Sequence, residues 1–161
     1  MYKAVMILKR WPVLFLLFLT FLVLLANVGR SQVIITEFAA VNSNGLKDED
    51  GAFSDWIELF NQGTTNVNLD GWFLTDSSAS LTKWRIPATN IGANTFLIVF
   101  ASGKNRATPG LPLHANFGLS ASGEYLALVK PDGVTVASEF SPVFPEQFPN
   151  VSYGIGQNVQ V

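Results

Sequence analysis

Four carboxylates lie within eight residues of one another and form the densest group of potential ligands in the chain. They are Asp48, Glu49, Asp50 and Asp55. Gly51 permits a sharp turn that would aim several of these oxygens at one hard cation, and calcium suits such ligands. We therefore predict a calcium site whose ligands are Asp48, Asp50 and Asp55.

The spacing of these carboxylates differs from that of an EF-hand. Counted from Asp48, Ala52 holds the fifth position and Leu59 the twelfth, where an EF-hand needs an oxygen ligand and a glutamate. The alternative to calcium is a solvated loop in which Asp55 hydrogen-bonds nearby backbone amides.

Catalytic chemistry has few candidate residues. His114 is the only histidine, and the chain contains no cysteine, which excludes thiol catalysis and a cysteine-based zinc site. A hydrolase could pair His114 with a serine, but no serine stands in a nucleophile-elbow motif. A metal-dependent hydrolase built from the Asp48–Asp55 carboxylates and His114 would need these groups to converge in a cleft. We predict no catalytic residues, no cofactor apart from calcium, and a chain that is not an enzyme.

Aromatic residues suggest a second kind of site. If exposed, they could stack on sugar rings, as aromatic residues of carbohydrate-binding modules do. The residues concerned are Trp56, Trp72, Trp84, Tyr125 and Tyr153. Because most of them alternate with Ile, Leu and Val, we expect most to pack in the core. Trp72 shares a strand face with Leu74 and is predicted to be buried.

The first 31 residues have the features of an export signal. Lys3, Lys9 and Arg10 precede an apolar run from Val13 to Leu25, and Gly29-Arg30-Ser31 offers small residues for cleavage before Gln32. The alternative is an uncleaved membrane anchor, for which the apolar run is short. Both interpretations place the rest of the chain outside the cytoplasm, secreted or at the cell surface.

Charge argues against nucleic acid as a partner. Four of the 10 basic residues lie in the leader, so six remain against 12 acidic residues, a formal charge of −6. A nucleic-acid-binding domain normally carries a basic surface. Lys83, Arg85, Lys104, Arg106 and Lys130 could form a small basic patch, but scattered solvated cations are expected. The membrane is a partner only if the leader stays uncleaved.

Short segments of alternating or continuous apolar residues follow the leader and predict β-strands. They are Val33–Val41, Trp56–Asn61, Val67–Asp76, Lys83–Ile86, Phe96–Ala101, a weak Leu113–Leu119, Glu124–Lys130 and Val134–Phe140. In the first of these, Ile34, Phe38 and Ala40 are expected to share a face. Pro131-Asp132-Gly133 predicts a tight hairpin turn between the last two strands.

These strands predict an all-β fold. No 3.6-residue apolar period persists outside the leader, and Pro142, Pro145 and Pro149 exclude a regular helix near the end. Seven to nine short strands would form a sandwich of two antiparallel sheets. We therefore divide the chain into a leader at residues 1–31, a β-sandwich at 32–154 and a tail at 155–161.

Several motifs resemble, in order, those of the lamin-tail domain, an immunoglobulin-like module of nuclear lamins and of many secreted bacterial proteins. They are "ITEF", "DEDGAFSDWIELFN", "VNLDGWFLTD", "LTKWRIP", "FLIVFASGKNR", "LHANFGLSASGEYLALVKPDG" and "VSYG". The resemblance implies an immunoglobulin-like β-sandwich with no catalytic residues attributed to the fold. In secreted bacterial proteins such modules accompany nuclease, hydrolase or spore-coat-type kinase domains.

Two functions follow from these observations. The first is a non-catalytic extracellular or cell-surface module that binds a protein or a polysaccharide. The second is the accessory domain of a larger secreted enzyme, of which this chain would be an N-terminal fragment and the tail a truncated linker. The sequence downstream of Val161 would distinguish them.

Overall fold

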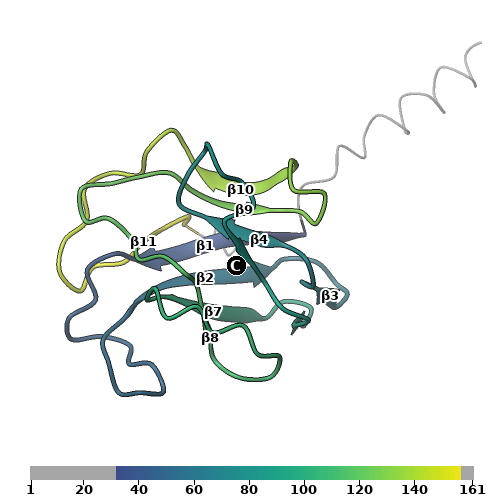
Figure 1. Cartoon of the computed structure of the whole chain (residues 1–161), viewed down its shortest axis with the longest axis horizontal. Coiled ribbons are helices and arrows are strands. Elements are labelled where there is room, and N and C mark those ends of the chain that lie inside the picture. The colour runs from purple at the N-terminus through teal and green to yellow at the C-terminus, as the bar shows by residue number, and fades with distance from the viewer. Residues whose placement is uncertain (1–31, 157–161) are drawn as a thin grey trace, which may run out of the picture. The chain divides into compact units, whose positions relative to one another are not determined.

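The segments with alternating apolar residues form strands, and the fold is all β (Figure 1). The computed structural model describes residues 32–156, which contain eleven strands and no helix. The predicted fold class is therefore confirmed. The predicted leader lies outside the described residues. Within residues 32–156 there is no helix long and apolar enough to cross a membrane.

Two sheets make up the sandwich, and a small two-stranded sheet lies beside them. The five-stranded sheet has, in spatial order, β11 (Tyr153–Gly154), β1 (Val33–Ala39), β2 (Asp55–Asn61), β7 (Phe96–Ala101) and β8 (Leu113–His114). The four-stranded sheet has β10 (Val136–Phe140), β9 (Leu126–Val129), β4 (Phe73–Thr75) and β5 (Trp84–Arg85). The remaining pair is β3 (Val67–Asn68) with β6 (Asn90–Ile91). All pairings are antiparallel except β7 with β8, which is parallel.

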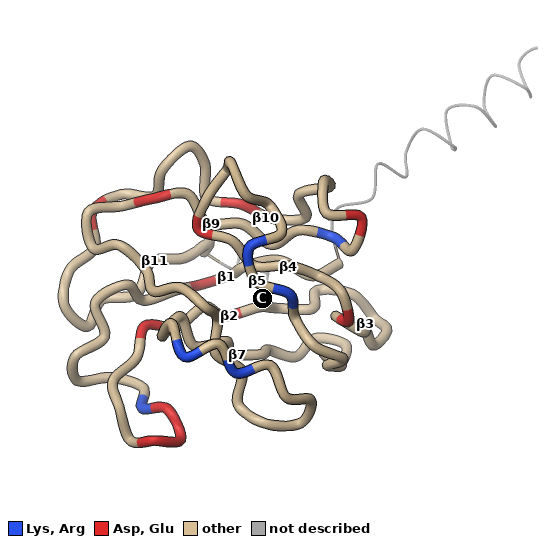
Figure 2. The backbone as a smooth tube through the Cα atoms, viewed as in Figure 1, with Lys and Arg blue, Asp and Glu red and all other residues tan. Residues whose placement is uncertain are grey.

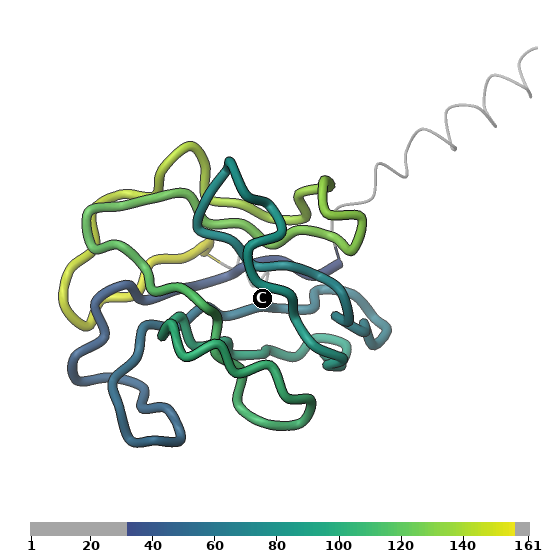
Figure 3. Tube along the Cα trace, in the orientation of Figure 1, coloured from purple at the N-terminus to yellow at the C-terminus, as the bar shows by residue number. Residues whose placement is uncertain are grey.

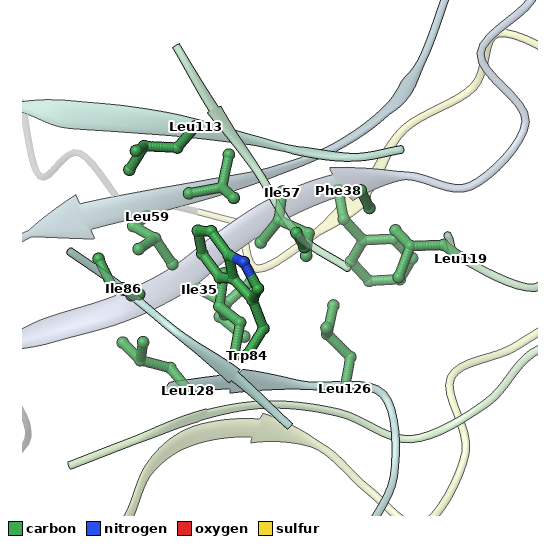
Figure 4. Close-up of a cluster of buried hydrophobic side chains, with 14 of the residues drawn as sticks. Ile35, Phe38, Ile57, Leu59, Trp84, Ile86, Leu113, Leu119, Leu126 and Leu128 are labelled. Atoms are coloured by element: carbon green, nitrogen blue, oxygen red, sulfur yellow. The ribbon is translucent and has the colours of Figure 1, made fainter. Parts of the chain in front are cut away.

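The core lies between the two sheets (Figure 4). Ile35, Ile57 and Leu59 project into it from the five-stranded sheet, and Leu126 and Leu128 face them from the four-stranded sheet. All five side chains are 0% exposed. A fully buried aliphatic side chain of this size stabilises the fold by about 1.5–3 kcal/mol. Because the chain lacks cysteine, this packing takes the place of disulfides.

Strand β1 corrects the predicted alternation of faces. Val33, Ile35 and Phe38 are fully buried, whereas Ile34 lies on the outer face. The register between β1 and β2 shifts between Ile35 and Glu37. This bulge inserts one extra residue, so the buried positions change from odd to even numbers. The prediction that Ile34 and Phe38 share a face was therefore wrong.

The segment from Val67 to Asp76 forms two short strands instead of one. β3 pairs with β6, whereas β4 lies in the four-stranded sheet between β9 and β5. Between them, the backbone N–H of Trp72 donates to the carbonyl of Leu69 at 3.0 Å, and Gly71 has φ of 79°. This turn carries the chain from one sheet to the other. Because this predicted strand divides in two and other short strands also form, the described residues contain eleven strands and not the predicted seven to nine.

The C-terminal third agrees with the predicted hairpin. β9 and β10 pair antiparallel across Pro131-Asp132-Gly133, and Asp132 Oδ1 accepts the backbone N–H of Val134 at 3.0 Å and of Thr135 at 2.8 Å. After β10 the chain runs without a helix and passes beside the loop between β1 and β2 (Figure 3). There Asn150 donates its backbone N–H to the carbonyl of Val41 at 2.9 Å.

Candidate functional site

Two loops at one end of the five-stranded sheet bring the predicted acidic residues against basic ones. The β1–β2 loop, residues 40–54, carries the acidic turn, which is the red tip at the lower left of Figure 2. The β7–β8 loop, residues 102–112, supplies the basic side chains. We call the group that they form with β8 the acid–base cluster. Its members are Asp48, Glu49, Asp50, Lys104, Arg106 and His114.

Ion pairs join these two loops at short distances. Lys104 Nζ donates to Asp48 Oδ2 at 2.6 Å and to Asp50 Oδ2 at 2.7 Å. Arg106 reaches Glu49 Oε1 at 2.6 Å and Asp50 Oδ2 at 2.8 Å. The hydrogen bonds from Arg106 and Lys104 hold the pKa of Asp50 below its ordinary value. Each carboxylate of the turn thus has a cationic neighbour.

Asp48 organises the turn itself. Its side chain is 0% exposed, and its Oδ1 accepts the backbone N–H groups of Asp50 and Ala52, each at 3.0 Å. Ser54 Oγ donates to Oδ2 at 2.7 Å. Burial raises the pKa of Asp48, but the hydrogen bonds from Lys104, Ser54 and Ala52 outweigh burial and hold that pKa well below its usual range.

Asn42 fixes the rest of the β1–β2 loop. Its Nδ2 donates to the carbonyls of Leu46 at 2.6 Å and Ser54 at 2.8 Å, and its Oδ1 accepts the backbone N–H of Gly45 at 2.9 Å. The loop is therefore ordered by protein hydrogen bonds to Asn42 and Asp48.

Asp55 makes its hydrogen bonds outside the acid–base cluster. It accepts the backbone N–H of Asn42 at 3.2 Å, and burial raises its pKa while the bonds from Asn42 and Leu119 act in the opposite direction. Among residues 32–156 no group of three or more His, Cys, Asp or Glu side chains is arranged to hold a metal ion. The calcium site of Asp48, Asp50 and Asp55 stays a prediction, and calcium would have to compete with Lys104 for the first two.

His114 has two side-chain partners that sequence spacing did not reveal. Its Nδ1 lies 2.8 Å from Ser102 Oγ, and its Nε2 lies 2.8 Å from Glu49 Oε2. Because the carboxylate only accepts, Nε2 carries a proton, and in the neutral ring Nδ1 accepts from the Ser102 hydroxyl. Hydrogen bonds from His114 and Arg106 lower the pKa of Glu49 despite some desolvation.

A hydroxyl, imidazole and carboxylate in this order also occur in serine hydrolases. Here, however, the side chain of His114 is 0% exposed and stacks on Phe100 with ring centroids 5.1 Å apart. Ser102 Oγ also accepts the backbone N–H of Lys104 at 3.3 Å. These contacts lock the three groups into the junction of β7, β8 and the β1–β2 loop. The arrangement is suited to holding the loops together.

The predicted aromatic residues occupy different environments. Trp84 is 3% exposed in the core, and its Nε1 donates to Asn105 Oδ1 at 3.2 Å. Tyr125 is also buried and donates to Glu139 Oε2 at 2.7 Å; its burial and this bond raise its pKa to about 12. Trp72 is only half-buried, although it packs against the core, so the prediction that it is a buried core residue was wrong. Tyr153 is exposed.

The outer face of the five-stranded sheet carries a separate, open pocket. Its volume is about 490 Å³, and Thr36, Glu37, Glu58, Phe96 and Ile155 are among the residues that line it. Phe60 stacks on Phe96 with ring centroids 4.5 Å apart. The volume lies within the usual range for small-ligand pockets, although this pocket is open to solvent. Local sequence patterns do not reveal this pocket, because its residues come from four different strands or strand ends.

The comparison with known families agrees with this architecture. The sequence model of the family described as Lamin Tail Domain matches residues 28–141, which is more than half of the chain. No curated protein matches the chain. The family explains the immunoglobulin-like sandwich and indicates a binding or structural module. The chain belongs to the lamin tail domain family.

Proposed function

We propose that this chain is a non-catalytic module that is exported from the cytoplasm and binds a partner through the outer face of its five-stranded sheet. The observation that carries the proposal is the pocket on that face, which Glu37, Glu58 and Phe96 help to line. It offers polar and apolar contacts on an accessible face, whereas the side chain of His114 is 0% exposed. Binding without turnover fits such a layout.

Export rests on the leader. Positive residues, an apolar run and small residues occur there in the order that a secretory signal needs. The secreted and the anchored form would both present residues 32–156 outside the cell. An extracellular protein or a polysaccharide is the class of partner that this location offers.

The test is to express the full chain with its leader and to locate it by fractionation. Intact mass then distinguishes a product that begins at Gln32 from an uncleaved one. The recovered protein is assayed for nuclease, protease, esterase and glycosidase activity beside the Ser102→Ala variant. A protein found only in the cytosol would refute export, and turnover that Ser102→Ala abolishes would refute the non-catalytic role.

A further inference from the structure

Two glutamates stand directly opposite each other on neighbouring strands of the five-stranded sheet, and both line the pocket on its outer face. Glu37 of β1 is the direct antiparallel partner of Glu58 of β2, and both side chains line the pocket. Like charges directly opposite on neighbouring strands repel and destabilise a sheet. The free fold therefore holds an unfavourable pair of like charges among the residues that line its pocket.

No cation among residues 32–156 forms an ion pair with either glutamate. The ion pairs of Lys83, Arg85, Lys104 and Arg106 all go to other carboxylates. Glu58 Oε1 accepts the Thr36 hydroxyl at 2.7 Å, and Glu37 Oε1 accepts the Ser152 hydroxyl. Each carboxylate therefore accepts one hydroxyl proton from within the fold. An ionised carboxylate has further lone pairs, and these can accept additional donors from a ligand.

Apolar surface borders the two carboxylates. Phe96 and Ile155 line the same pocket, and each is 51% exposed. Phe96 is held in place by its stacking on Phe60, with an interplanar angle of 27°. An occupant of this pocket would therefore contact apolar side chains and carboxylate acceptors together.

We propose that this pocket binds a lysine or arginine side chain of an extended, basic segment of a partner protein. A long aliphatic stem would lie on Phe96 and Ile155, and the ammonium or guanidinium group would donate to Glu37 and Glu58. A neutral sugar would leave the two like charges without compensation, so charge complementarity favours the basic peptide. The inference rests on the proposed binding function and names the partner chemistry for the same face.

The test uses the full chain, purified from whichever cell fraction contains it, and three capped peptides. The probes are Gly-Leu-Arg-Leu-Gly, Gly-Leu-Lys-Leu-Gly and the neutral Gly-Leu-Gln-Leu-Gly, with a neutral oligosaccharide beside them. Calorimetry measures affinity, and amide NMR shifts of Thr36 and Glu58 report the site. We expect the two basic peptides to bind, to weaken as salt increases, and to shift these amides.

Matched variants separate this pocket from general charge effects. Glu37→Gln together with Glu58→Gln should weaken binding of the basic peptides by about tenfold or more. Glu146→Gln makes the same chemical change at one exposed residue outside the pocket and should leave affinity unchanged. Phe96→Ala should weaken binding, whereas Phe148→Ala, at a phenylalanine that is 61% exposed and does not line the pocket, should not.

Several outcomes would overturn the inference. They are equal binding of the glutamine peptide, an affinity unchanged in the double glutamine variant, binding of the oligosaccharide alone, or no binding of either basic peptide. The proposed function fails by different results, namely retention in the cytosol or turnover lost in Ser102→Ala. The two failures are therefore distinguishable.

Discussion

Lys104 Nζ lies 2.6 Å from Oδ2 of Asp48, and the two residues are 56 positions apart in the sequence. The bond joins the β7–β8 loop to the β1–β2 loop. Asp48 also accepts two backbone N–H groups within its own turn. One carboxylate thus shapes its own loop and attaches that loop to the next.

Removing Lys104 should loosen this end of the sandwich. In Lys104→Met the buried oxygen of Asp48 loses its cationic donor, and an incompletely paired buried carboxylate is unfavourable. We expect a clear fall in the midpoint of urea unfolding. Lys130→Met is the control, because Lys130 makes no ion pair among the described residues. Equal midpoints for the two variants would mean that the ion pair contributes nothing.

The lowered pKa of Asp48 predicts loss of stability in acid. In the unfolded chain Asp48 takes up a proton near its ordinary pKa of 3.8, whereas in the folded chain its pKa is lower. Between these two pKa values the unfolded state binds more protons than the folded state. The stabilisation is therefore present above the ordinary pKa of 3.8 and is lost as pH falls toward the folded pKa. The lowered pKa values of Glu49 and Asp50 likewise reduce stability as pH falls. The raised pKa of Asp55 makes the folded state relatively more stable in acid.

Urea titrations at about pH 6 and about pH 3 measure this acid effect. The free energy of unfolding should fall between the two, and it should fall less in Asp48→Asn, which cannot ionise at this position. A wild-type protein as stable at the lower pH as at the higher one would contradict the prediction.

Trp84 and Trp72, both expected in the core from the sequence, should respond differently to truncation. Trp84 is 3% exposed within the core, so Trp84→Ala should cost about 3–5 kcal/mol, as for other large buried aromatic residues. Trp72 is half-buried, so Trp72→Ala should cost less. Denaturant titration of both variants makes the comparison. A larger loss of unfolding free energy in Trp72→Ala than in Trp84→Ala would show that the exposed fraction does not predict which tryptophan contributes more to stability.

Calcium binding can be tested through competition with Lys104. If Asp48, Asp50 and Asp55 bind calcium, the ion must displace the lysine from the first two carboxylates. Calcium should then raise the melting temperature of Lys104→Met more than that of the wild type, by mass action on the folded state. Asp48→Asn with Asp50→Asn should remove the response. No shift against chelator in either protein would refute the calcium site.

Local signals in the sequence predicted the parts of the fold that depend on neighbouring residues. Phe96–Ala101 forms a strand with the predicted bounds, because its continuous apolar run is short and flanked by turn residues. The β9–β10 hairpin follows from Pro131-Asp132-Gly133. The bulge near Ile35 was not predictable in this way, since only the pairing of β1 with β2 reveals the extra residue.

The candidate sites depend on contacts between distant segments, and there the sequence was less informative. Glu49 and His114 are 65 positions apart, and no local spacing relates them. Glu37 and Glu58 face each other only because β1 and β2 pair in one register. A register that differed by one residue would place one of them in the core.

The opposition of Glu37 and Glu58 makes a final prediction about the free protein. Glu58→Gln keeps the size of the side chain and an oxygen that can accept from Thr36, but it removes one of two like charges. Relief of a cross-strand repulsion should raise the free energy of unfolding by about 0.2–1 kcal/mol. Urea titration at low ionic strength gives the largest difference, and added salt should reduce it.

Glu146→Gln, which removes a charge at an exposed position away from this pair, should change stability little. A Glu58→Gln protein less stable than the wild type would mean that this carboxylate stabilises the sheet. Repulsion between Glu37 and Glu58 would then give no reason to expect a bound cation that relieves it.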